Sequence, residues 1–362
     1  MNIDIIAGAR PNFMKIAPII AAIQEQQRNQ PNSIGYRLIH TGQHYDKNMS
    51  DNFFEQLNIP QPDVNLEAGG GTQAEQTAAI MVRYEKLLME APADLCLVVG
   101  DVTSTMACSI VAKKMLMRVA HVEAGIRSHD LTMPEEINRM VTDSITDYFF
   151  TTSEVANQNL LNSGIPAERI FFVGNTMIDT LLKNQTRFIQ PEFWNELGLE
   201  KGRYLVMTLH RPANVDQAEK LRSLIHEITT HANGLPIVFP VHPRTGKIFK
   251  ELGIAAPNLH TVEPQGYLQF NYLVAHAMGV ITDSGGITEE TTVLKVPCIT
   301  LRDNTERPET VTIGTNELIG TDPAAIAPAL QKLHAGAWKK GEIPPLWDGK
   351  TAGRIVDALL NL

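Results

Sequence analysis

A chain of 362 residues is longer than one ordinary α/β core, so we expect two domains of roughly 150–200 residues each. A net charge of -9 argues against nucleic acid as a partner, and no apolar run approaches the ~18 residues of a membrane span. The start at Met1 lacks the basic residues of a signal peptide. Cys96, Cys108 and Cys298 form no metal or disulfide pattern, and we interpret them as buried thiols of a cytoplasmic protein.

Strand and helix patterns alternate along nearly the whole chain. Short apolar runs predict strands at 3–7, 36–41, 95–99, 119–123, 148–151, 170–173, 204–208, 237–241, 260–262, 279–282 and 298–301. Amphipathic segments between them predict helices, for example at 72–90, 104–117, 217–231, 266–277 and 287–293. This alternation predicts parallel sheets that helices cover on both faces.

A polar stretch over residues 187–202 divides this alternation into two halves. We therefore expect an α/β protein with two Rossmann-like, doubly wound domains, over residues 1–187 and 188–345. An amphipathic pattern within residues 346–362 predicts a closing helix that packs back across the domains. Ligands of open parallel sheets bind beyond the carboxyl ends of the strands, so we expect the two domains to face a central cleft.

The most informative turn of the chain follows the predicted strand 279–282. There an apolar run leads through Ser284, Gly285 and Gly286 into a helix. Such a turn suits an anion, because glycine lets backbone N–H groups approach a phosphate and the helix N-terminus adds partial positive charge. Glu290, near the end of the first turn, is suited to accept hydrogen bonds from two ribose hydroxyls. These features predict a nucleotide site; the alternative is an ordinary turn with a capping serine.

A second glycine turn follows the first predicted strand. Gly8 and Ala9 lead through Arg10 into apolar positions with helical spacing, and Lys15 lies in that helix. Cations on a strand–turn–helix corner favour a second anion site. The alternative for Lys15 is a solvated helix face.

Acidic side chains follow two predicted strands and begin one predicted helix. Asp101 and Glu123 each end an apolar strand, and Glu135 and Glu136 follow Pro134. Carboxylates gathered in one cleft perturb each other's pKa values, which suits proton transfer. The alternatives are a helix cap at Asp101 and a helix-dipole role for Glu135 or Glu136. Glu123 is the strongest single candidate, because charges that end buried strands are uncommon.

Motifs along the chain together resemble one enzyme family. In order they are GARP at 8–11, GD at 100–101, HVEAG at 121–125, PEEINR at 134–139, GNT at 174–176, HR at 210–211, DSGGITEE at 283–290 and RDNTERPE at 302–309. This combination is similar to that of the non-hydrolysing UDP-N-acetylglucosamine 2-epimerases. The resemblance implies the glycosyltransferase-B type of fold. It also implies reversible conversion of UDP-N-acetylglucosamine (UDP-GlcNAc) to UDP-N-acetylmannosamine (UDP-ManNAc) without metal or cofactor, in the supply of cell-surface polysaccharide.

The resemblance implies a mechanism in which UDP leaves C1 as a proton leaves C2, giving a 2-acetamidoglucal to which UDP adds back. Asp101, Glu123 and Glu135 would be the acid and base groups, and which of them serves which face of C2 stays open. His210 would stabilise the departing UDP.

The resemblance also implies a set of binding residues. They are Arg10, Lys15, Arg139, Phe270, Ser284, Gly285, Gly286, Glu290 and Arg307. Arg10 and Lys15 would neutralise the pyrophosphate, beside hydrogen bonds from the glycine turn. Glu290 would hold the ribose, and Phe270 would stack on uracil. A core position for Phe270 and a bridge from Arg307 to nearby acids are the alternatives.

Two departures from the family pattern leave the sugar and the regulation open. After His210 and Arg211 the chain continues Pro-Ala-Asn, where many relatives have Arg-Glu or Glu-Asn. UDP-sugars altered at C3 or C6, such as diacetamido uronic acids, are therefore alternative substrates. In some relatives the region around residues 41–46 helps to form a second, activating UDP-GlcNAc site. Such an allosteric site would here contain Gln43, His44, Arg211 and His242.

Other functional classes differ in their need for proton-transfer groups. A glycosyltransferase of the same fold would also bind a UDP-sugar, but it needs fewer such groups than Asp101, Glu123 and Glu135 offer. A non-catalytic binding protein would need none of them. A hydrolysing epimerase, which releases free N-acetylmannosamine and UDP, stays an alternative. We expect a homodimer that binds a UDP-sugar and neither nucleic acid nor a membrane.

Overall fold

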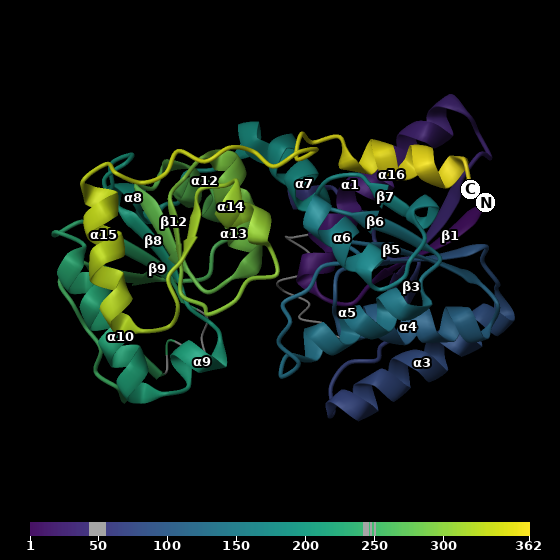
Figure 1. Ribbon diagram of the computed structural model, residues 1–362, viewed down its shortest axis with the longest axis horizontal. Coiled ribbons are helices and arrows are strands. Elements are labelled where there is room, and N and C mark those ends of the chain that lie inside the picture. Colours follow the sequence, from purple (N-terminus) through teal and green to yellow (C-terminus); the bar gives the residue numbers. More distant parts are fainter. Residues whose placement is uncertain (43–55, 242–245, 247, 250) are drawn as a thin grey trace. The chain divides into compact units, whose positions relative to one another are not determined.

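The computed structural model describes the chain except for residues 43–55, 242–245, 247 and 250. It divides into two compact units. Unit 1 contains Met1–Lys183 and Pro345–Leu362, and unit 2 contains Asn184–Pro344 (Figure 1). No helix within the described residues has the length and apolar character to cross a membrane.

Unit 1 is built on a parallel sheet of seven strands within the described residues, in the order β3-β2-β1-β4-β5-β6-β7. The strands are β1 (Asn2–Ala7), β2 (Gly35–His40), β3 (Val64–Asn65), β4 (Leu95–Val99), β5 (Arg118–Val122), β6 (Tyr148–Thr151) and β7 (Ile170–Phe172). The helices are α1 (Arg10–Asn29), α3 (Gln73–Glu90), α4 (Thr103–Lys114), α5 (Pro134–Ile145), α6 (Glu154–Asn162), α7 (Thr176–Asn184) and α16 (Thr351–Leu360). α3, α4 and α5 cover one face of the sheet, and α1 and α16 cover the other (Figure 1).

Unit 2 repeats this architecture with a parallel sheet of six strands in its described part, in the order β10-β9-β8-β11-β12-β13. The strands are β8 (Leu205–Thr208), β9 (Ile237–Pro240), β10 (Leu259–Val262), β11 (Gly279–Thr282), β12 (Cys298–Thr300) and β13 (Asn316–Leu318). The helices are α8 (Phe193–Glu196), α9 (Pro212–Val215), α10 (Ala218–His231), α12 (Tyr267–His276), α13 (Gly285–Leu294), α14 (Pro308–Thr312) and α15 (Ile326–His334). The predicted α/β class with two doubly wound sheets is confirmed.

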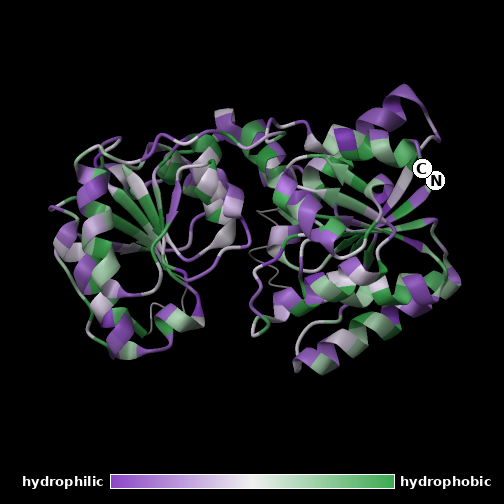
Figure 2. Cartoon of the chain, viewed as in Figure 1, coloured by the Kyte–Doolittle hydropathy of each residue, from purple (hydrophilic) through white to green (hydrophobic). Residues whose placement is uncertain are grey.

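The central strands of both sheets are largely apolar on both faces, because each sheet lies between helix layers. In β8 and the residue before it, Leu205 and Met207 enter one core cluster, whereas Tyr204 and Val206 enter the cluster on the opposite face. Successive side chains of a strand point to opposite faces, so a continuous apolar run is what a sheet covered on both faces requires. Figure 2 shows these hydrophobic strands inside each unit and hydrophilic residues on the outer helices.

Each predicted strand lies within a residue or two of an observed one, but two short edge strands were not predicted. β3 pairs with β2 through Ile39 and Val64, and β13 pairs with β12 through Ile299 and Glu317. Two or three residues with polar members show no periodicity. The neighbouring strand, rather than the local pattern, makes these segments extended.

The C-terminal helix α16 belongs to unit 1 and packs against α1. The Asp179 carboxylate accepts hydrogen bonds from the first backbone N–H groups of this helix, at 3.1 Å from Thr351 N and 2.7 Å from Ala352 N. These N–H groups have no partner within their own helix, so an acid at this position satisfies them and also complements the helix dipole. A residue 172 positions away in sequence thus fixes the end of the chain to unit 1.

The GNT motif at 174–176 has a structural explanation in the same contact. Gly174 has φ +103, and a Cβ atom there would lie 2.1 Å from the backbone oxygen of Leu346. Trp347, which is fully buried, donates its indole N–H to the oxygen of Thr152 at 3.0 Å. Gly174 is therefore needed so that the returning chain can approach β7 closely.

Candidate active site

Each sheet has one point where neighbouring strands are far apart in sequence. In unit 1 this point lies between β1 and β4, and in unit 2 it lies between β8 and β11. Connections leave to opposite sides at such a point, which opens a crevice at the carboxyl ends of the strands. Asp101, His210 and Ser284 lie on the turns that follow β4, β8 and β11.

Glu123 directly follows β5 and is buried, with 3% exposure. Its carboxylate forms an ion pair with the Lys15 ammonium of α1, at 2.7 Å. The Glu123 backbone has φ +70, a conformation that non-glycine residues rarely adopt and that clusters at functional sites. Gly100 also has a positive φ, and a Cβ atom there would lie 3.1 Å from Lys15 Nζ. Lys15 was predicted to bind the pyrophosphate. In the structure it contacts Glu123, one of the candidate proton-transfer carboxylates.

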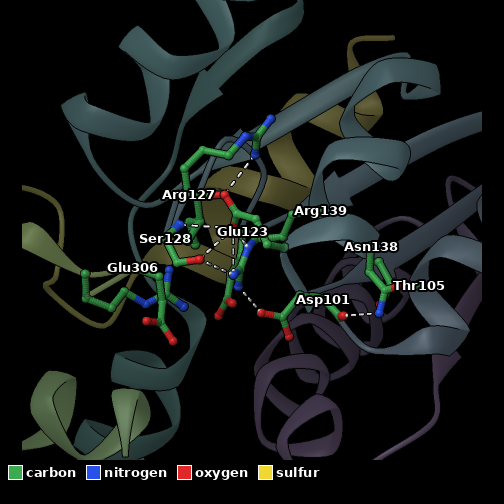
Figure 3. Close-up of polar contacts among 12 residues, drawn as sticks. Asp101, Thr105, Glu123, Arg127, Ser128, Asn138, Arg139 and Glu306 are labelled. Carbon is green, nitrogen blue, oxygen red and sulfur yellow. Dashed lines mark hydrogen bonds and ion pairs between the residues drawn. The ribbon is translucent and has the colours of Figure 1, made fainter. Parts of the chain in front are cut away.

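Asp101 follows β4, and α5 holds it from two sides. Asn138 donates its side-chain N–H to the Asp101 backbone oxygen at 2.8 Å, and the Arg139 guanidinium forms an ion pair with the Asp101 carboxylate (Figure 3). Arg139 is buried and also pairs with Glu136, at 2.8 Å. The Asp101 side chain is 31% exposed, so Arg139 holds one side of the carboxylate while the other side stays open to solvent.

The two acids that begin α5 have different environments. Glu136 is buried and accepts hydrogen bonds from the backbone N–H groups of Ser128 and His129, both at 3.0 Å. Burial opposes its ionisation, but these bonds and Arg139 hold the pKa of Glu136 below its usual range. Glu136 therefore fixes the loop before the helix. Glu135 is exposed, which leaves its carboxylate accessible to a ligand.

His210 follows β8, and the Asp283 carboxylate after β11 orients it. The Nδ1 atom of His210 lies 2.8 Å from Asp283 Oδ1. Asp283 also accepts hydrogen bonds from the backbone N–H groups of His210 and Arg211 and from the side-chain amide of Asn214, at 3.0–3.1 Å. Burial opposes its ionisation, but the His210 hydrogen bond and these donors hold the pKa of Asp283 below its usual range. The His210 side chain is 59% exposed, so its far edge is accessible.

Asp283 begins the DSGGITEE motif, but no role in the active site was predicted for it from the sequence. The signal for it was the one used for Asp101 and Glu123, an acid directly after an apolar strand. The structure makes Asp283 the residue that positions His210, because β8 and β11 are neighbours in the sheet.

The glycine turn at the start of α13 has the geometry of an anion site. Ser284 precedes the helix, and Gly285 and Gly286 are its first two residues. A Cβ atom on Gly286 would have no heavy atom within 4 Å, so this side of the turn has free space. The first N–H groups of a helix have no intrahelical partner and lie at the positive end of its dipole. The turn can therefore donate hydrogen bonds to a phosphate.

Glu290 lies in the same helix and is buried against α12. Its carboxylate is 3.5 Å from the side-chain nitrogen of Asn271, and it also interacts with the Tyr267 hydroxyl. Burial raises the pKa of Glu290 to about 7, although hydrogen bonds from Asn271 and Tyr267 act in the opposite direction. The neighbouring Glu289 pairs with Arg307 at 2.5 Å, and both of these side chains are buried.

Cations and acids alternate beside this glycine turn. Arg302, which is buried, pairs with Glu306 at 2.6 Å, and Arg211 lies 3.7 Å from the same carboxylate. Burial opposes ionisation, but Arg302 and Arg211 lower the pKa of Glu306 to about 2. Arg211 also donates from Nε to the Asp283 backbone oxygen at 3.0 Å. The turn is thus surrounded by guanidinium groups whose charge Glu306 partly compensates.

The structure describes only some of the remaining candidate residues. Phe270 packs partly buried against the core cluster that contains Trp194 and Val274. Arg10 begins α1, but its side chain lies outside the described part of the protein. The allosteric candidates Gln43, His44 and His242 also lie outside it. Within the described residues, no group of three or more His, Cys, Asp or Glu residues could hold a metal ion.

Comparisons with known proteins show the family of the chain. The family model for UDP-N-acetylglucosamine 2-epimerase matches residues 26–360. A UDP-N-acetylglucosamine 2-epimerase of Methanocaldococcus jannaschii is 41% identical, with 99% of each chain covered. The crystal structure of an epimerase from that organism, in complex with UDP-GlcNAc and UDP, matches all of both chains with a TM-score of 0.89 and 41% identity.

A third relative acts on a different sugar. The UDP-2,3-diacetamido-2,3-dideoxy-D-glucuronate 2-epimerase of Pseudomonas aeruginosa is 39% identical, with 88% of each chain covered. The match to the family model and the full-length relatives agree on one conclusion. The chain belongs to the UDP-N-acetylglucosamine 2-epimerase family.

Proposed function

We propose that the protein interconverts UDP-GlcNAc and UDP-ManNAc by inverting C2 of the sugar. The observation that carries this proposal is the buried Glu123 carboxylate, held by Lys15 after β5, beside the turn that carries Asp101. Inversion at C2 needs proton transfer on both faces of one carbon, and the two carboxylates lie on neighbouring strand ends of unit 1. The family membership and the UDP-GlcNAc complex of a full-length relative support the same substrate.

The C2 proton of the sugar is not acidic enough for simple deprotonation, so we propose an elimination. A carboxylate takes the C2 proton, the C2–H electron pair forms the C1–C2 double bond, and UDP leaves C1 with the C1–O pair. The product is 2-acetamidoglucal. Protonation of C2 on the other face and re-addition of UDP at C1 then give the epimer. Atoms and charge balance without an oxidant or a metal.

We assign the proton transfers to Asp101, Glu123 and Glu135. An ammonium in contact with a carboxylate stabilises the ionised form, so the Lys15–Glu123 pair favours Glu123 as a proton acceptor. Arg139 holds the Asp101 carboxylate in one orientation, and one side of this carboxylate stays exposed to solvent. Glu135 lies on the same helix as Arg139 and is exposed, which suits a group that meets the substrate only in the complex.

We assign UDP binding largely to unit 2. The N–H groups of Gly285 and Gly286, the first residues of α13, and the hydroxyl of Ser284 before them would bind the pyrophosphate. The exposed edge of His210 would donate a proton or hydrogen bond to UDP as negative charge develops on it, while Asp283 stabilises the cationic imidazole. The Glu290 carboxylate would accept hydrogen bonds from the ribose hydroxyls.

Four further side chains complete the proposed substrate contacts. Arg10 from unit 1 would add positive charge at the pyrophosphate. Phe270 would stack on uracil with the face that the core leaves accessible. Arg139 and Arg307, which are each held by an acid, would orient the sugar and the phosphates. We also keep Arg211, together with Gln43, His44 and His242, as candidates for an activating UDP-GlcNAc site.

A second candidate substrate is a UDP-2,3-diacetamido uronic acid. It is favoured by the 39% identity to a relative named for that reaction. The same carboxylates and the same UDP site would serve it, because the chemistry at C1 and C2 is unchanged. A hydrolysing outcome, with free N-acetylmannosamine and UDP as products, would follow if water rather than UDP added to the intermediate.

Incubation of the pure protein with UDP-GlcNAc in D2O, followed by NMR, tests the reaction and its mechanism together. The expected result is a UDP-ManNAc signal with deuterium at C2. Free N-acetylmannosamine would show the hydrolysing reaction instead. Turnover of only the diacetamido uronic acid derivative would select the second substrate, and retention of the C2 proton in UDP-ManNAc would contradict the elimination.

We further propose that the protein acts in the cytoplasm and as a homodimer. Cys96, Cys108 and Cys298 are all buried free thiols, which suits a reducing compartment. Light scattering of the purified protein measures the oligomeric state, and a monomer at micromolar concentration would contradict the dimer.

A further inference from the structure

His121 lies in β5, two residues before Glu123, and is completely buried. It belongs to the HVEAG motif, yet the proposed mechanism gives it no role. A histidine inside an apolar sheet must have partners for both ring nitrogens, because an unsatisfied buried polar group costs about 1–3 kcal/mol. The partners of His121 connect the two turns that carry the proposed acid and base.

Each ring nitrogen of His121 contacts a different part of the site. Nε2 lies 2.8 Å from the backbone oxygen of Gly100, the residue before Asp101. Nδ1 lies 2.7 Å from Oδ1 of Asp143 in α5. The other carboxylate oxygen of Asp143 accepts hydrogen bonds from the Gly125 backbone N–H at 3.1 Å and from Arg127 at 2.6 Å. The pair therefore joins the turn after β4 to the turn after β5.

These contacts determine the protonation state of the ring. A backbone carbonyl can only accept a hydrogen bond, so Nε2 must carry a proton. The Asp143 carboxylate already accepts from Gly125 and Arg127, which favours its ionised form, and an ionised carboxylate can only accept. Nδ1 must therefore carry a proton as well. The hydrogen-bond geometry therefore points to a proton on each ring nitrogen, and Asp143 and Arg127 are the charged groups that face the ring.

We propose that His121, as an imidazolium, and Asp143 are positioning residues that set the separation between Asp101 and Glu123. This inference rests on the proposed function, in which these two acids act on one sugar carbon. α5 reinforces the frame, because it carries Asp143 and also Asn138, which holds the Asp101 backbone oxygen. A shift of about 1 Å in such a frame can lower the rate about 100-fold without removing a catalytic group.

The protonation state is tested by ¹⁵N NMR of the histidine-labelled, full-length protein, with His121→Gln used to assign the signal. The expected spectrum shows a proton on each ring nitrogen of His121, because both of its hydrogen-bond partners are fixed acceptors. A neutral ring at pH 7 would overturn the proposal. Asp143→Asn, whose amide can donate to Nδ1, is expected to convert His121 to the neutral form with a proton on Nε2.

The positioning role is tested by kinetics of His121→Gln and Asp143→Asn. We expect kcat to fall about 10- to 100-fold in each, while KM and the affinity for UDP change less than about twofold, since neither residue is a proposed UDP contact and most of these contacts lie in unit 2. Tyr84→Phe is the matched control. It removes a buried hydrogen bond to Asp4 in the same unit, at 3.1 Å, so it should lower stability without lowering kcat.

The outcomes separate the two proposals. Loss of stability with an unchanged kcat per folded molecule in both His121 and Asp143 variants would overturn the positioning role and leave the epimerase function intact. A wild-type protein that converts no UDP-sugar would overturn the proposed function and the positioning role with it. The imidazolium spectrum would be unaffected by that result, because it needs no substrate.

Discussion

Glu123 in unit 1 and Asp283 in unit 2 are both buried acids directly after a parallel strand, yet their partners differ in kind. Asp283 accepts from two backbone N–H groups, one amide and one imidazole. Glu123 pairs with the flexible ammonium of Lys15, at the end of a side chain from α1. Backbone donors lock a carboxylate as a permanent acceptor. A side-chain ammonium can change its position when the carboxylate gains or loses a proton. The Glu123 arrangement therefore suits proton transfer, and the Asp283 arrangement suits positioning.

The largest effect is expected from Glu123→Gln. Removal of a general acid or base lowers kcat on the order of 10²–10⁴. The affinity for UDP should hardly change, because most of the proposed UDP contacts lie in unit 2 and Glu123 is not one of them. Steady-state kinetics and calorimetric titration with UDP measure both quantities. Asp101→Asn is the companion variant, and a fully active Glu123→Gln would show that Glu123 has only a structural role.

The next effect concerns His210, the group that Asp283 orients. His210→Asn should lower kcat about 100-fold and leave KM nearly unchanged, because negative charge on UDP grows only as the C1–O bond breaks. Product formation at saturating and at low UDP-GlcNAc separates the two constants. A raised KM with a normal kcat would mean that His210 binds substrate and transition state equally.

Asp283→Asn should affect stability more than Glu123→Gln does. It weakens the acceptor for several buried donors, which costs about 1–3 kcal/mol. Because folding lowers the pKa of Asp283, its contribution is present above the ordinary Asp pKa of about 3.9 and is lost as pH falls through the folded value.

Urea unfolding midpoints at pH 7 and at low pH measure this difference. The variant should be less stable than the wild type at pH 7, and the two should converge at low pH. Equal unfolding midpoints of Asp283→Asn and Glu123→Gln at pH 7 would contradict the expectation that Asp283 contributes more to stability than Glu123.

The smallest effect is a pH dependence at Glu290. Its pKa is raised to about 7 by burial, so the carboxylate that would hold the ribose forms only as pH rises through 7. The affinity for UDP should therefore rise by up to about tenfold between pH 6 and pH 8. Glu290→Gln is the matched control, because titration of the UDP phosphate is common to both proteins. If the UDP affinities of the wild type and of Glu290→Gln changed with pH in parallel, the proposed ribose-binding role of Glu290 would be contradicted.

The sequence determined the layered α/β architecture and most strand positions. A buried strand needs a continuous apolar run and an outer helix needs an amphipathic one, and both are local properties of the chain. The glycine turns were also visible locally, since glycine residues between an apolar run and a helix allow close backbone approach, although an ordinary capped turn has the same local pattern. The short strands β3 and β13 were missed, because neighbouring strands rather than local residues define them.

Tertiary structure alone decided the partners of the charged residues. An acid after an apolar strand gave the same local signal at Asp101, Glu123 and Asp283, but strand order brought Asp283 to His210 and placed Lys15 on Glu123. Hydrogen bonds and ion pairs depend on donors from distant segments, here 73 and 108 positions away. Apolar periodicity follows from each segment by itself, whereas the chemistry of a buried acid depends on the donors that the fold brings to it.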